Sequence, residues 1–378
     1  MVERRATKNV GSIRKKYART QNKKSQRRET MKLRMLAHVS MVVGAFAAGP
    51  VVAQAAEVTG PKVSWNLSTW GKQRAFTVGV EYIAAQLAEK TGGNFTIKIH
   101  YGEALSKARE NLDGIKLGAF QAAQICNFYH PGKNPAWMVL TMPFLPLGDL
   151  EVSMKVREAL MKHPAFVADM SNWNAMAYFS ALLPQYEFLG KGDMPTTLAG
   201  WKGKRVRAGG GVGTAMEKLG ATLSSVPATE VYTAMERGTV DAASFPYTYA
   251  HASYQLPEVS TWFTSNMSPG TSECATVLNK DAYAKLPDQY KKLLMDLKPE
   301  AYKVQIKAYD DIDAKNLPMF RSKLKEIVYT DAQLKEFRTI GGQPVWDEWV
   351  AANKDKFDAK GLLDLIAAEA DKAIAAKK

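Results

Sequence analysis

The segment Gly203–Gly220, GKRVRAGGGVGTAMEKLG, has the residue order of a strand, a glycine-rich turn and a helix. Arg205 and Arg207 flank an apolar valine and precede three glycines. Such a turn can bind an anion through free backbone amides at a helix N-terminus. Nucleotide motifs are incomplete, because no Gly-Lys-Ser/Thr follows and Pro227 and Ala228 stand where a ribose-binding acid is expected. The segment predicts an α/β unit that does not bind a nucleotide.

The residues on either side of this segment continue the alternation of strands and helices. Period-two apolar patterns or short apolar runs predict strands within 62–71, 95–102, 122–128 and 176–184. Helical spacing predicts helices within 76–90 and from Glu103 to Phe120. This order implies parallel sheets covered by helices, in two α/β domains. Past Thr271 we expect one more strand and then long charged amphipathic helices.

The charge of the chain is concentrated at its N-terminus. The formal net charge is +14 over 378 residues, but residues 1–56 hold 13 of the 51 basic residues and two of the 37 acidic ones. A nucleic-acid partner would therefore depend on residues 1–30 alone, and we expect none. These residues fit an RNA-binding arm, a disordered basic extension, or sequence upstream of a true start at Met31.

Residues 31–56 have the features of a secretory signal peptide. Lys32 and Arg34 precede an apolar run from Met41 through Ala48, and small residues follow up to Ala55. The run is short for a bilayer-spanning helix of about 20 residues. We expect export to the periplasm and a mature protein that is soluble.

No residue pattern predicts catalysis or a metal centre. Neither a His-Glu-x-x-His motif nor a Gly-x-Ser-x-Gly elbow is present. Cys126 and Cys274 match no metal spacing, and in an exported chain they are either a disulfide or two free thiols. We expect no catalytic residue, no metal and no cofactor.

Five motifs in order resemble the DctP-type solute receptors of TRAP (tripartite ATP-independent periplasmic) transporters. They are EKTGGNFTIKIHYGEAL (89–105), TMPFLP (141–146), LAGWKGKRVR (198–207), EVYTAMERGTVDAASFP (230–246) and LNKDAYAKLP (278–287). The resemblance covers nearly all of residues 61–350. It implies a receptor that binds a small organic acid and delivers it to a TRAP membrane permease.

The resemblance also implies a two-domain periplasmic binding protein-like fold with a hinge. We expect domain I to contain residues 57–184 and 272–310. Domain II is expected to contain residues 185–271 and 311–378, including the long C-terminal helices. A solute-binding protein of an ATP-driven importer is the alternative within this class, and an exported enzyme acting on an organic acid is the alternative outside it.

The family's carboxylate-binding arginine corresponds to Arg207, and Arg205 corresponds to a less specific basic position. Arginine fits a carboxylate because its planar fork donates two parallel hydrogen bonds. Phe245 stands where sialate-binding members have an asparagine, so sialic acid is not the expected solute. Phe245 and Tyr247, with Trp70 and Phe128, are candidates for an apolar pocket wall, and core packing is the alternative for each.

Some relatives bind a keto or hydroxy acid through a cation. Gln185 and Glu273 are the candidates for such a role here, although a ligand-associated cation is not the favoured interpretation. Together with Arg207, Phe245, Tyr247, Trp70 and Phe128, they complete the predicted ligand-binding residues.

Overall fold

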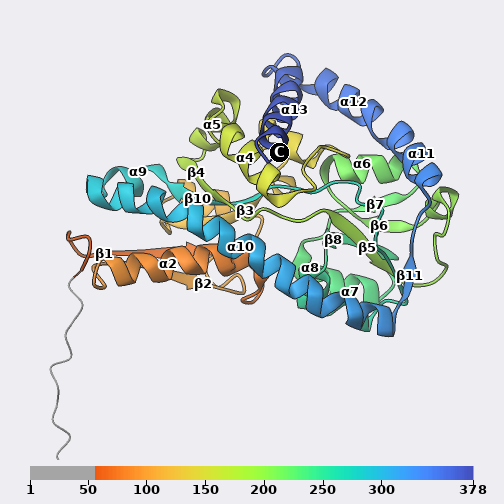
Figure 1. The fold of residues 1–378 in the computed structure, drawn as a ribbon, viewed down its shortest axis with the longest axis horizontal. Helices are drawn as coiled ribbons and strands as arrows, with labels where there is room; N and C mark the ends of the chain where they lie inside the picture. The colour runs from red at the N-terminus through yellow and green to blue at the C-terminus, as the bar shows by residue number, and fades with distance from the viewer. Residues whose placement is uncertain (1–55, 378) are drawn as a thin grey trace, which may run out of the picture. The chain divides into compact units, whose positions relative to one another are not determined.

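Two sheets organise residues 56–377, which are the residues that the computed structural model describes (Figure 1). The basic extension predicted for residues 1–30 lies outside them, as does the predicted signal peptide 31–56 apart from Ala56. The first sheet has the strand order β2-β1-β3-β10-β4 and the second has the order β11-β9-β5-β8-β6-β7. We call the parts of the chain built on these two sheets the first lobe and the second lobe.

The strands of each sheet come from separate parts of the chain. The first sheet contains β1 (Val63–Ser68), β2 (Phe95–His100), β3 (Ala122–Cys126), β4 (Ala175–Ser180) and β10 (Cys274–Asn279). The second contains β5 (Tyr186–Gly190), β6 (Arg205–Arg207), β7 (Thr222–Ser224), β8 (Ala242–Pro246), β9 (Trp262–Thr264) and β11 (Lys325–Ile327). The two-domain α/β prediction is confirmed.

The parallel pairing predicted from the alternation holds for β1, β2 and β3 and for β6, β7 and β8, but each sheet also contains antiparallel pairs. β10 runs antiparallel to β3 and β4, and β5 runs antiparallel to β8 and β9. Each of these two strands is the first one that the chain forms after it crosses from one lobe to the other. The first strand that the chain adds to a sheet after crossing therefore runs opposite to the parallel strands of the βα units in that sheet. A local sequence pattern does not reveal this direction.

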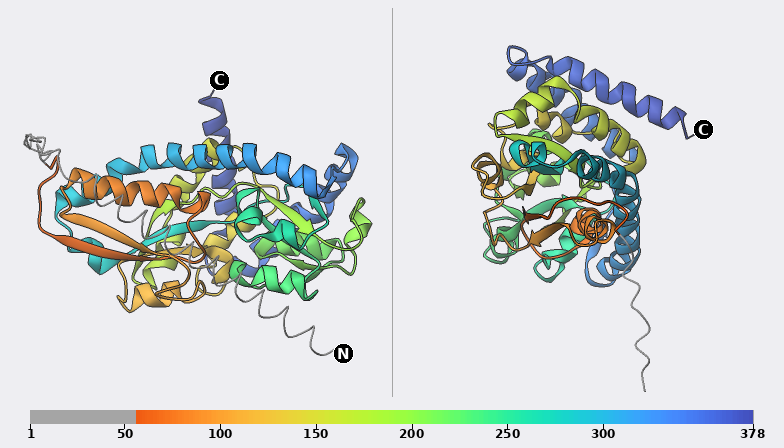
Figure 2. Two further views of the ribbon diagram at one scale, coloured as in Figure 1. Left: turned by 90° about the horizontal axis from the view of Figure 1, so that it is seen from below. Right: turned by 90° about the vertical axis from the view of Figure 1, so that its left-hand side faces the viewer.

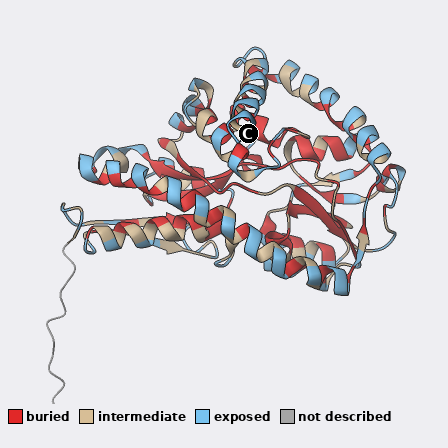
Figure 3. Cartoon of the chain, viewed as in Figure 1, coloured by how far each residue is buried: buried red, intermediate tan, exposed pale blue. Residues whose placement is uncertain are grey.

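Helices cover both faces of the sheets. They are α2 (Val78–Lys90), α3 (Asn111–Lys116), α4 (Leu150–Leu160), α5 (Pro164–Ser171), α6 (Gly210–Lys218), α7 (Val231–Glu236), α8 (Tyr249–Ser253), α9 (Lys280–Ala284), α10 (Asp288–Lys323), α11 (Asp331–Gly341), α12 (Gln343–Asn353) and α13 (Ala359–Ala375). Buried side chains of α2, α7, α8 and α10 share one hydrophobic cluster, and those of α3 to α6 and α11 to α13 share the other. The strands between them are largely buried, whereas the outer helix faces are exposed (Figure 3).

The helix predicted from Glu103 to Phe120 is much shorter in the structure, where it is limited to α3. Gly102 and Glu103 have positive φ angles of 66° and 61°, a conformation that an α-helix does not contain. The carboxylate of Glu103 then accepts a hydrogen bond of 2.9 Å from the backbone N–H of Ala108. Residues 103–110 therefore form a turn that leads into the helix.

Two segments without helix or strand structure connect the lobes and lie side by side. Residues 181–185 lead from β4 to β5, and residues 265–273 lead from β9 to β10. Ala181 N–H donates to the Cys274 carbonyl at 2.9 Å, and Tyr186 N–H donates to the Gly270 carbonyl at 2.8 Å. These paired segments are where a hinge between the lobes would lie.

The 36-residue helix α10 runs along both lobes (Figures 1 and 2). Gln305 Oε1 accepts from Gly79 N–H at 2.9 Å in the first lobe, and Asp313 Oδ1 accepts from Thr248 N–H at 2.7 Å in the second. Tyr309 Oη donates to the Ala181 carbonyl of a connecting segment at 2.7 Å. The domain boundary expected at 310/311 falls inside this continuous helix, and α13, expected in domain II, packs against α4 of the first lobe.

Cys126 and Cys274 form a disulfide. The two residues are direct partners in the antiparallel pairing of β3 with β10. The disulfide thus joins the end of β3 to the first residue that re-enters the first sheet, and it settles the choice that the sequence left open.

Candidate functional site

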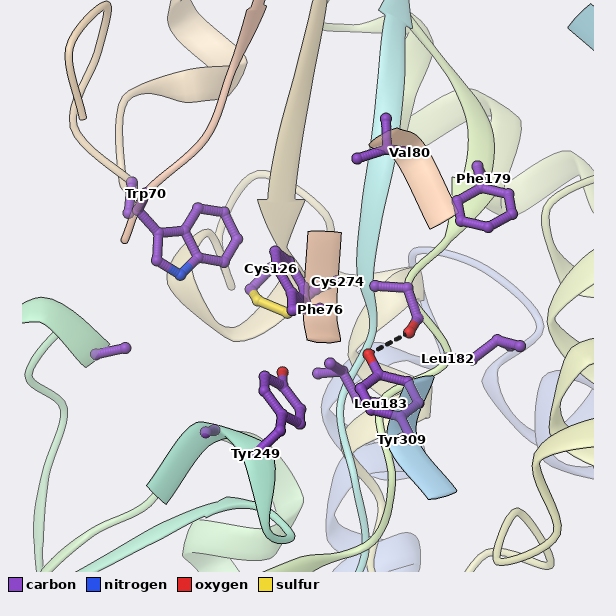
Figure 4. Packing of buried hydrophobic residues seen from close by; sticks show 14 of the residues in the cluster. Trp70, Phe76, Val80, Cys126, Phe179, Leu182, Leu183, Tyr249, Cys274 and Tyr309 are labelled. Carbon is purple, nitrogen blue, oxygen red and sulfur yellow. Dashed lines mark hydrogen bonds between the residues drawn. A yellow bond between two sulfur atoms is a disulfide. The ribbon is translucent and has the colours of Figure 1, made fainter. Parts of the chain in front are cut away.

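A small cavity lies between the lobes, next to the carboxyl ends of β1, β3 and β6 and along β8. Its volume is about 30 Å³. It is lined by Trp70, Arg74, Phe76, Cys126, Phe128, Tyr129, Leu183, Tyr186, Arg207, Ala228, Phe245, Pro246, Tyr249, Ala250, Tyr254 and Cys274. Crevices at the carboxyl ends of strands are where α/β sheets bind ligands. Figure 4 shows Trp70, Leu183, Tyr249 and the disulfide around this space.

Arg207 is the most buried charged group of the cavity wall, with 2% of its surface exposed. It ends β6, which pairs with β7 on one side and β8 on the other. Its Nη1 donates to the Ser244 carbonyl at 2.8 Å and its Nε donates to the Val226 carbonyl at 3.2 Å. These carbonyls fix the orientation of the guanidinium without neutralising it.

The remaining nitrogen of Arg207, Nη2, is buried and has no hydrogen-bond partner. No acidic side chain within residues 56–377 forms an ion pair with Arg207. The Cζ atom lies 4.3 Å from the ring centroid of Phe245 and 5.3 Å from that of Phe128. A buried charge without a counter-charge is costly, so an anion beside Nη2 would be strongly favoured.

Aromatic rings form most of the cavity wall. Eight of the lining residues are Phe, Tyr or Trp. The ring centroid of Tyr129 lies 5.6 Å from that of Trp70 and 4.6 Å from that of Phe128, and the Phe245 and Tyr254 centroids are 5.5 Å apart. These spacings are typical of interacting rings, so the wall suits a flat apolar ligand body.

Tyrosine hydroxyls and arginines supply the polar atoms of the wall. Burial raises the pKa of Tyr186 to about 12, and it also raises the pKa values of Tyr249 and Tyr254. These phenols stay protonated at neutral pH. With no Asp or Glu among the lining residues, the wall can donate hydrogen bonds to an anion and carries no negative charge.

The structure brings together four of the seven predicted ligand-binding residues. Arg207, Phe245, Trp70 and Phe128 all line the cavity. Trp70 and Phe128 come from the first lobe and the other two from the second, as their sheets require. Their contact with a ligand stays a prediction.

Tyr247, Gln185 and Glu273 are not among the lining residues. Tyr247 packs against His251 and Phe320, because β8 ends at Pro246 and its alternation of side chains ends there as well. The Gln185 carbonyl accepts from Tyr247 N–H at 3.1 Å. Ligand contact by these residues also stays a prediction.

Glu273 takes part in a buried ion pair with Arg157. Its Oε2 also accepts from Ser180 Oγ at 3.2 Å. No group of three His, Cys, Asp or Glu residues within positions 56–377 is arranged to hold a metal ion.

Four polar cavity residues did not emerge from the sequence: Arg74, Tyr129, Tyr249 and Tyr254. Arg74 follows β1 by six residues and Tyr129 follows β3 by three. The rule that identified Trp70 and Phe128, namely a position just after a strand at the ligand edge, applies to both of them as well.

The glycines after Arg207 serve contacts between the lobes. A Cβ atom on Gly209 would lie 2.6 Å from Phe128, and one on Gly211 would lie 2.7 Å from Met142. Gly210 has a φ of +58°, and a Cβ there would overlap Thr141. Arg205, in contrast, is 49% exposed and pairs with Asp241 outside the cavity.

The family model described as bacterial extracellular solute-binding protein, family 7 (DctP) matches residues 68–353 of this chain. The chain belongs to the DctP family. The family predicted from the sequence is thereby confirmed, and the protein is a TRAP solute-binding protein, not an enzyme. The family therefore favours neither of the two alternatives, a solute-binding protein of an ATP-driven importer or an exported enzyme.

One relative is similar to this chain in sequence, and two solved structures are similar to it in fold. A curated monocarboxylate 2-oxoacid-binding periplasmic protein of Nostoc sp. is 24% identical over 275 residues, 68% of this chain and 71% of that protein. A marine metagenome TRAP solute-binding protein from an unidentified microbe, solved with 3-hydroxybenzoate, gives a TM-score of 0.73 at 18% identity, covering 83% of this chain and 99% of that chain. A TRAP periplasmic solute-binding protein of Desulfovibrio salexigens with bound orotic acid gives 0.74 at 18% identity, covering 82% and 100%.

The DctP family consists of periplasmic binding proteins. None of the helices in the stretch 56–377 is both long and apolar enough to cross a membrane.

Proposed function

We propose that this receptor binds a small aromatic acid between its lobes, with the carboxylate against Arg207 and the ring among the aromatic side chains. The buried Arg207 guanidinium carries the proposal, because its Nη2 has no partner and no acid among residues 56–377 pairs with it. A carboxylate matches the planar donor geometry of arginine.

The aromatic wall selects the body of the solute. Phe128 and Phe245 lie on the guanidinium, and Trp70 and Tyr129 continue the ring surface in the first lobe. Offset or edge-to-face contacts would hold a flat ring among them. The 3-hydroxybenzoate and orotic acid bound by the two structural relatives combine a carboxylate with a flat ring, which supports this class.

Binding requires movement of the lobes or of the lining side chains. The cavity of about 30 Å³ is far smaller than the 300–1,000 Å³ usual for ligand sites. Residues 181–185 and 265–273 are the segments about which the lobes would separate. A solute that contacts both lobes favours the closed arrangement, in which the protein would deliver it to the TRAP permease. The predicted signal peptide would export the receptor to the periplasm.

A thermal-unfolding screen tests the proposal. The protein is unfolded and refolded to remove any copurified solute and is then heated with benzoate, 3-hydroxybenzoate or benzamide. Ligand at 100 times Kd stabilises by about 2.7 kcal/mol, enough to raise Tm by several degrees. We expect the acids to raise Tm and the neutral benzamide to leave it unchanged. Equal shifts with acid and amide, or no shift with any aromatic acid, would contradict the proposal.

A further inference from the structure

A second guanidinium lines the same cavity from the opposite lobe. Arg74 lies in the segment that follows β1, whereas Arg207 ends β6 in the second lobe. Arg74 Nη1 donates to the Trp70 carbonyl at 2.9 Å and to the Lys72 carbonyl at 2.7 Å. Its Nε is buried and has no partner. Like Arg207, it is oriented by backbone carbonyls and keeps a buried donor free, but its side chain as a whole is only partly buried.

The surroundings of the two arginines are also alike. Arg74 Cζ lies 4.5 Å from the ring centroid of Phe76 and 5.8 Å from that of Tyr254. Tyr254 in turn contacts Phe245, the ring that lies on Arg207, with 5.5 Å between centroids. One continuous aromatic surface therefore leads from one guanidinium to the other.

The hydroxyl oxygen of Tyr254 is a further polar atom next to Arg74. The hydroxyl of Tyr254 is buried and has no hydrogen-bond partner. A Cβ atom on Gly71 would lie 2.9 Å from Arg74 Nη1 and 3.0 Å from Tyr254 Oη, so these two atoms converge on one side of Gly71. Two free donors, Arg74 Nε and Tyr254 Oη, thus belong to the same end of the cavity wall.

The charges of the cavity wall are unbalanced. The wall contains two guanidinium groups and no Asp or Glu, and neither arginine forms an ion pair within residues 56–377. A monocarboxylate on Arg207 would leave Arg74 without a counter-charge. A solute with two negative charges would compensate both guanidiniums.

We propose that Arg74 and Tyr254 bind a second anionic group of the solute, and that the preferred solute is an aromatic dicarboxylate. This inference rests on the proposed function, in which the first carboxylate binds Arg207. The flat ring lies along the aromatic surface that connects the two arginines. Because each lobe contributes one guanidinium, the dianion bridges the lobes and favours their closure.

Calorimetric titrations with benzoate, isophthalate and terephthalate test this inference on the refolded protein. The three acids share the ring and one carboxylate and differ in the second. Because Arg74 is only partly buried, a charge-assisted hydrogen bond to it should change binding by about tenfold or more. We expect at least one of the dicarboxylates to bind the wild type about tenfold more tightly than benzoate.

Tyr254→Phe is the variant least able to disturb folding, because the hydroxyl it removes has no protein partner. We expect it to weaken dicarboxylate binding about tenfold and to weaken benzoate binding much less, because the aromatic ring is retained. Arg74→Gln should abolish the preference for the dicarboxylate while benzoate affinity stays within about threefold, and Arg74→Lys should restore part of the preference. Arg207→Gln should weaken binding of all three acids.

The outcomes separate the two proposals. Benzoate binding without any preference for a dicarboxylate would overturn the role of Arg74 and leave the proposed function standing. Equal losses for benzoate and dicarboxylate in Arg74→Gln and Tyr254→Phe would also overturn it, since that result means a structural role. Failure of the wild type to bind any of the acids would overturn both.

Discussion

Three ionisable side chains are buried in the second lobe, and none of them forms an ion pair within the described residues 56–377. Arg207 binds backbone carbonyls, Glu187 accepts from Thr264, Ser268 and Met267, and His251 Nε2 bonds to the Glu187 carbonyl at 3.1 Å. Burial, with a smaller contribution from the nearby Arg207, lowers the pKa of His251 to about 3. The imidazole is therefore neutral in the folded protein at neutral pH.

This burial predicts acid sensitivity at one residue. The folded pKa of His251 lies below the unfolded value of about 6.5, so its contribution is fully present above pH 6.5 and is lost as the pH falls toward 3. His251→Gln keeps a donor for the Glu187 carbonyl and cannot take up a proton. Between pH 6 and pH 4, the free energy of unfolding should fall less steeply in the variant than in the wild type. The two slopes should differ by about 1.4 kcal/mol per pH unit.

Denaturant unfolding at several pH values measures this difference. His130 is a suitable comparison, because burial lowers its pKa to about 4 and its substitution should have a similar effect from a site in the first lobe. Identical pH slopes for the wild type and His251→Gln would show that the imidazole is not buried in a neutral form.

At the level of side chains, the sequence predicted some of the cavity wall and missed the rest for physical reasons. Arg207 was indicated by its motif and by its position at a strand end. Arg74 lies in an irregular segment six residues past β1, so its only signal was a position after a strand at the ligand edge, and that position does not distinguish its guanidinium from that of an exposed arginine. In a continuous strand, Tyr247 would lie on the same face as Phe245. However, β8 ends at Pro246, between the two residues, and the chain turns away there.

Among the secondary-structure elements, α6 depends on both lobes. Its N-cap residue is Gly209, which has no side chain to accept from the first backbone amides. Thr141, at the end of the 3₁₀ helix Ala136–Thr141 in the first lobe, supplies the acceptor: Gly211 N–H donates to Thr141 Oγ1 at 2.9 Å. The helix that follows Arg207 is thus capped from the opposite lobe.

Thr141→Val tests whether this cap contributes to closure. The valine has the same shape and lacks the acceptor, and loss of a helix cap costs about 1 kcal/mol. If the cap forms only when the lobes are together, solute affinity should fall about fivefold, whereas Thr141→Ser should retain it. Titration of both variants with the same acid measures the effect, and equal Kd values for valine and serine would argue against the cap.

The elements themselves were largely predictable, and their directions were not. The period-two and helical patterns gave most strands and helices, including β6 and the turn into α6. β5 and β10 are antiparallel to their neighbours because of the paths that residues 181–185 and 265–273 take between the lobes. These paths depend on contacts between residues that are distant in sequence. The turn at residues 103–110 depends on positive φ angles at Gly102 and Glu103, and only the glycine is a residue type that suggests such an angle.

In the whole molecule, the chain passes between the lobes four times: through the two paired segments, through α10, and through α11 and α12 to α13, which packs on α4 of the first lobe. The disulfide Cys126–Cys274 closes a covalent loop with a sequence separation of 148 residues, which contains most of the second lobe. Such a loop limits the freedom of the unfolded chain. The bond therefore stabilises the fold without crossing between the sheets.

Replacing both cysteines by alanine should lower the free energy of unfolding by about 2–4 kcal/mol. Denaturant unfolding of the double variant and of the wild type, with and without reductant, measures this loss. Reductant should destabilise the wild type and leave the variant unaffected. An effect of reductant on the variant, or equal stabilities for the two proteins, would contradict the assignment.

The direct test of the central claim is calorimetric titration of Arg207→Gln and Arg205→Gln with an aromatic acid that the wild type binds. The two arginines are neighbours on β6, but Arg207 is buried in the cavity wall and Arg205 pairs with Asp241 on the surface. Loss of a buried charged partner costs about 2–5 kcal/mol, so Kd for Arg207→Gln should rise at least about 30-fold. Arg205→Gln should bind within about twofold of the wild type. An unchanged Kd for Arg207→Gln would contradict the account.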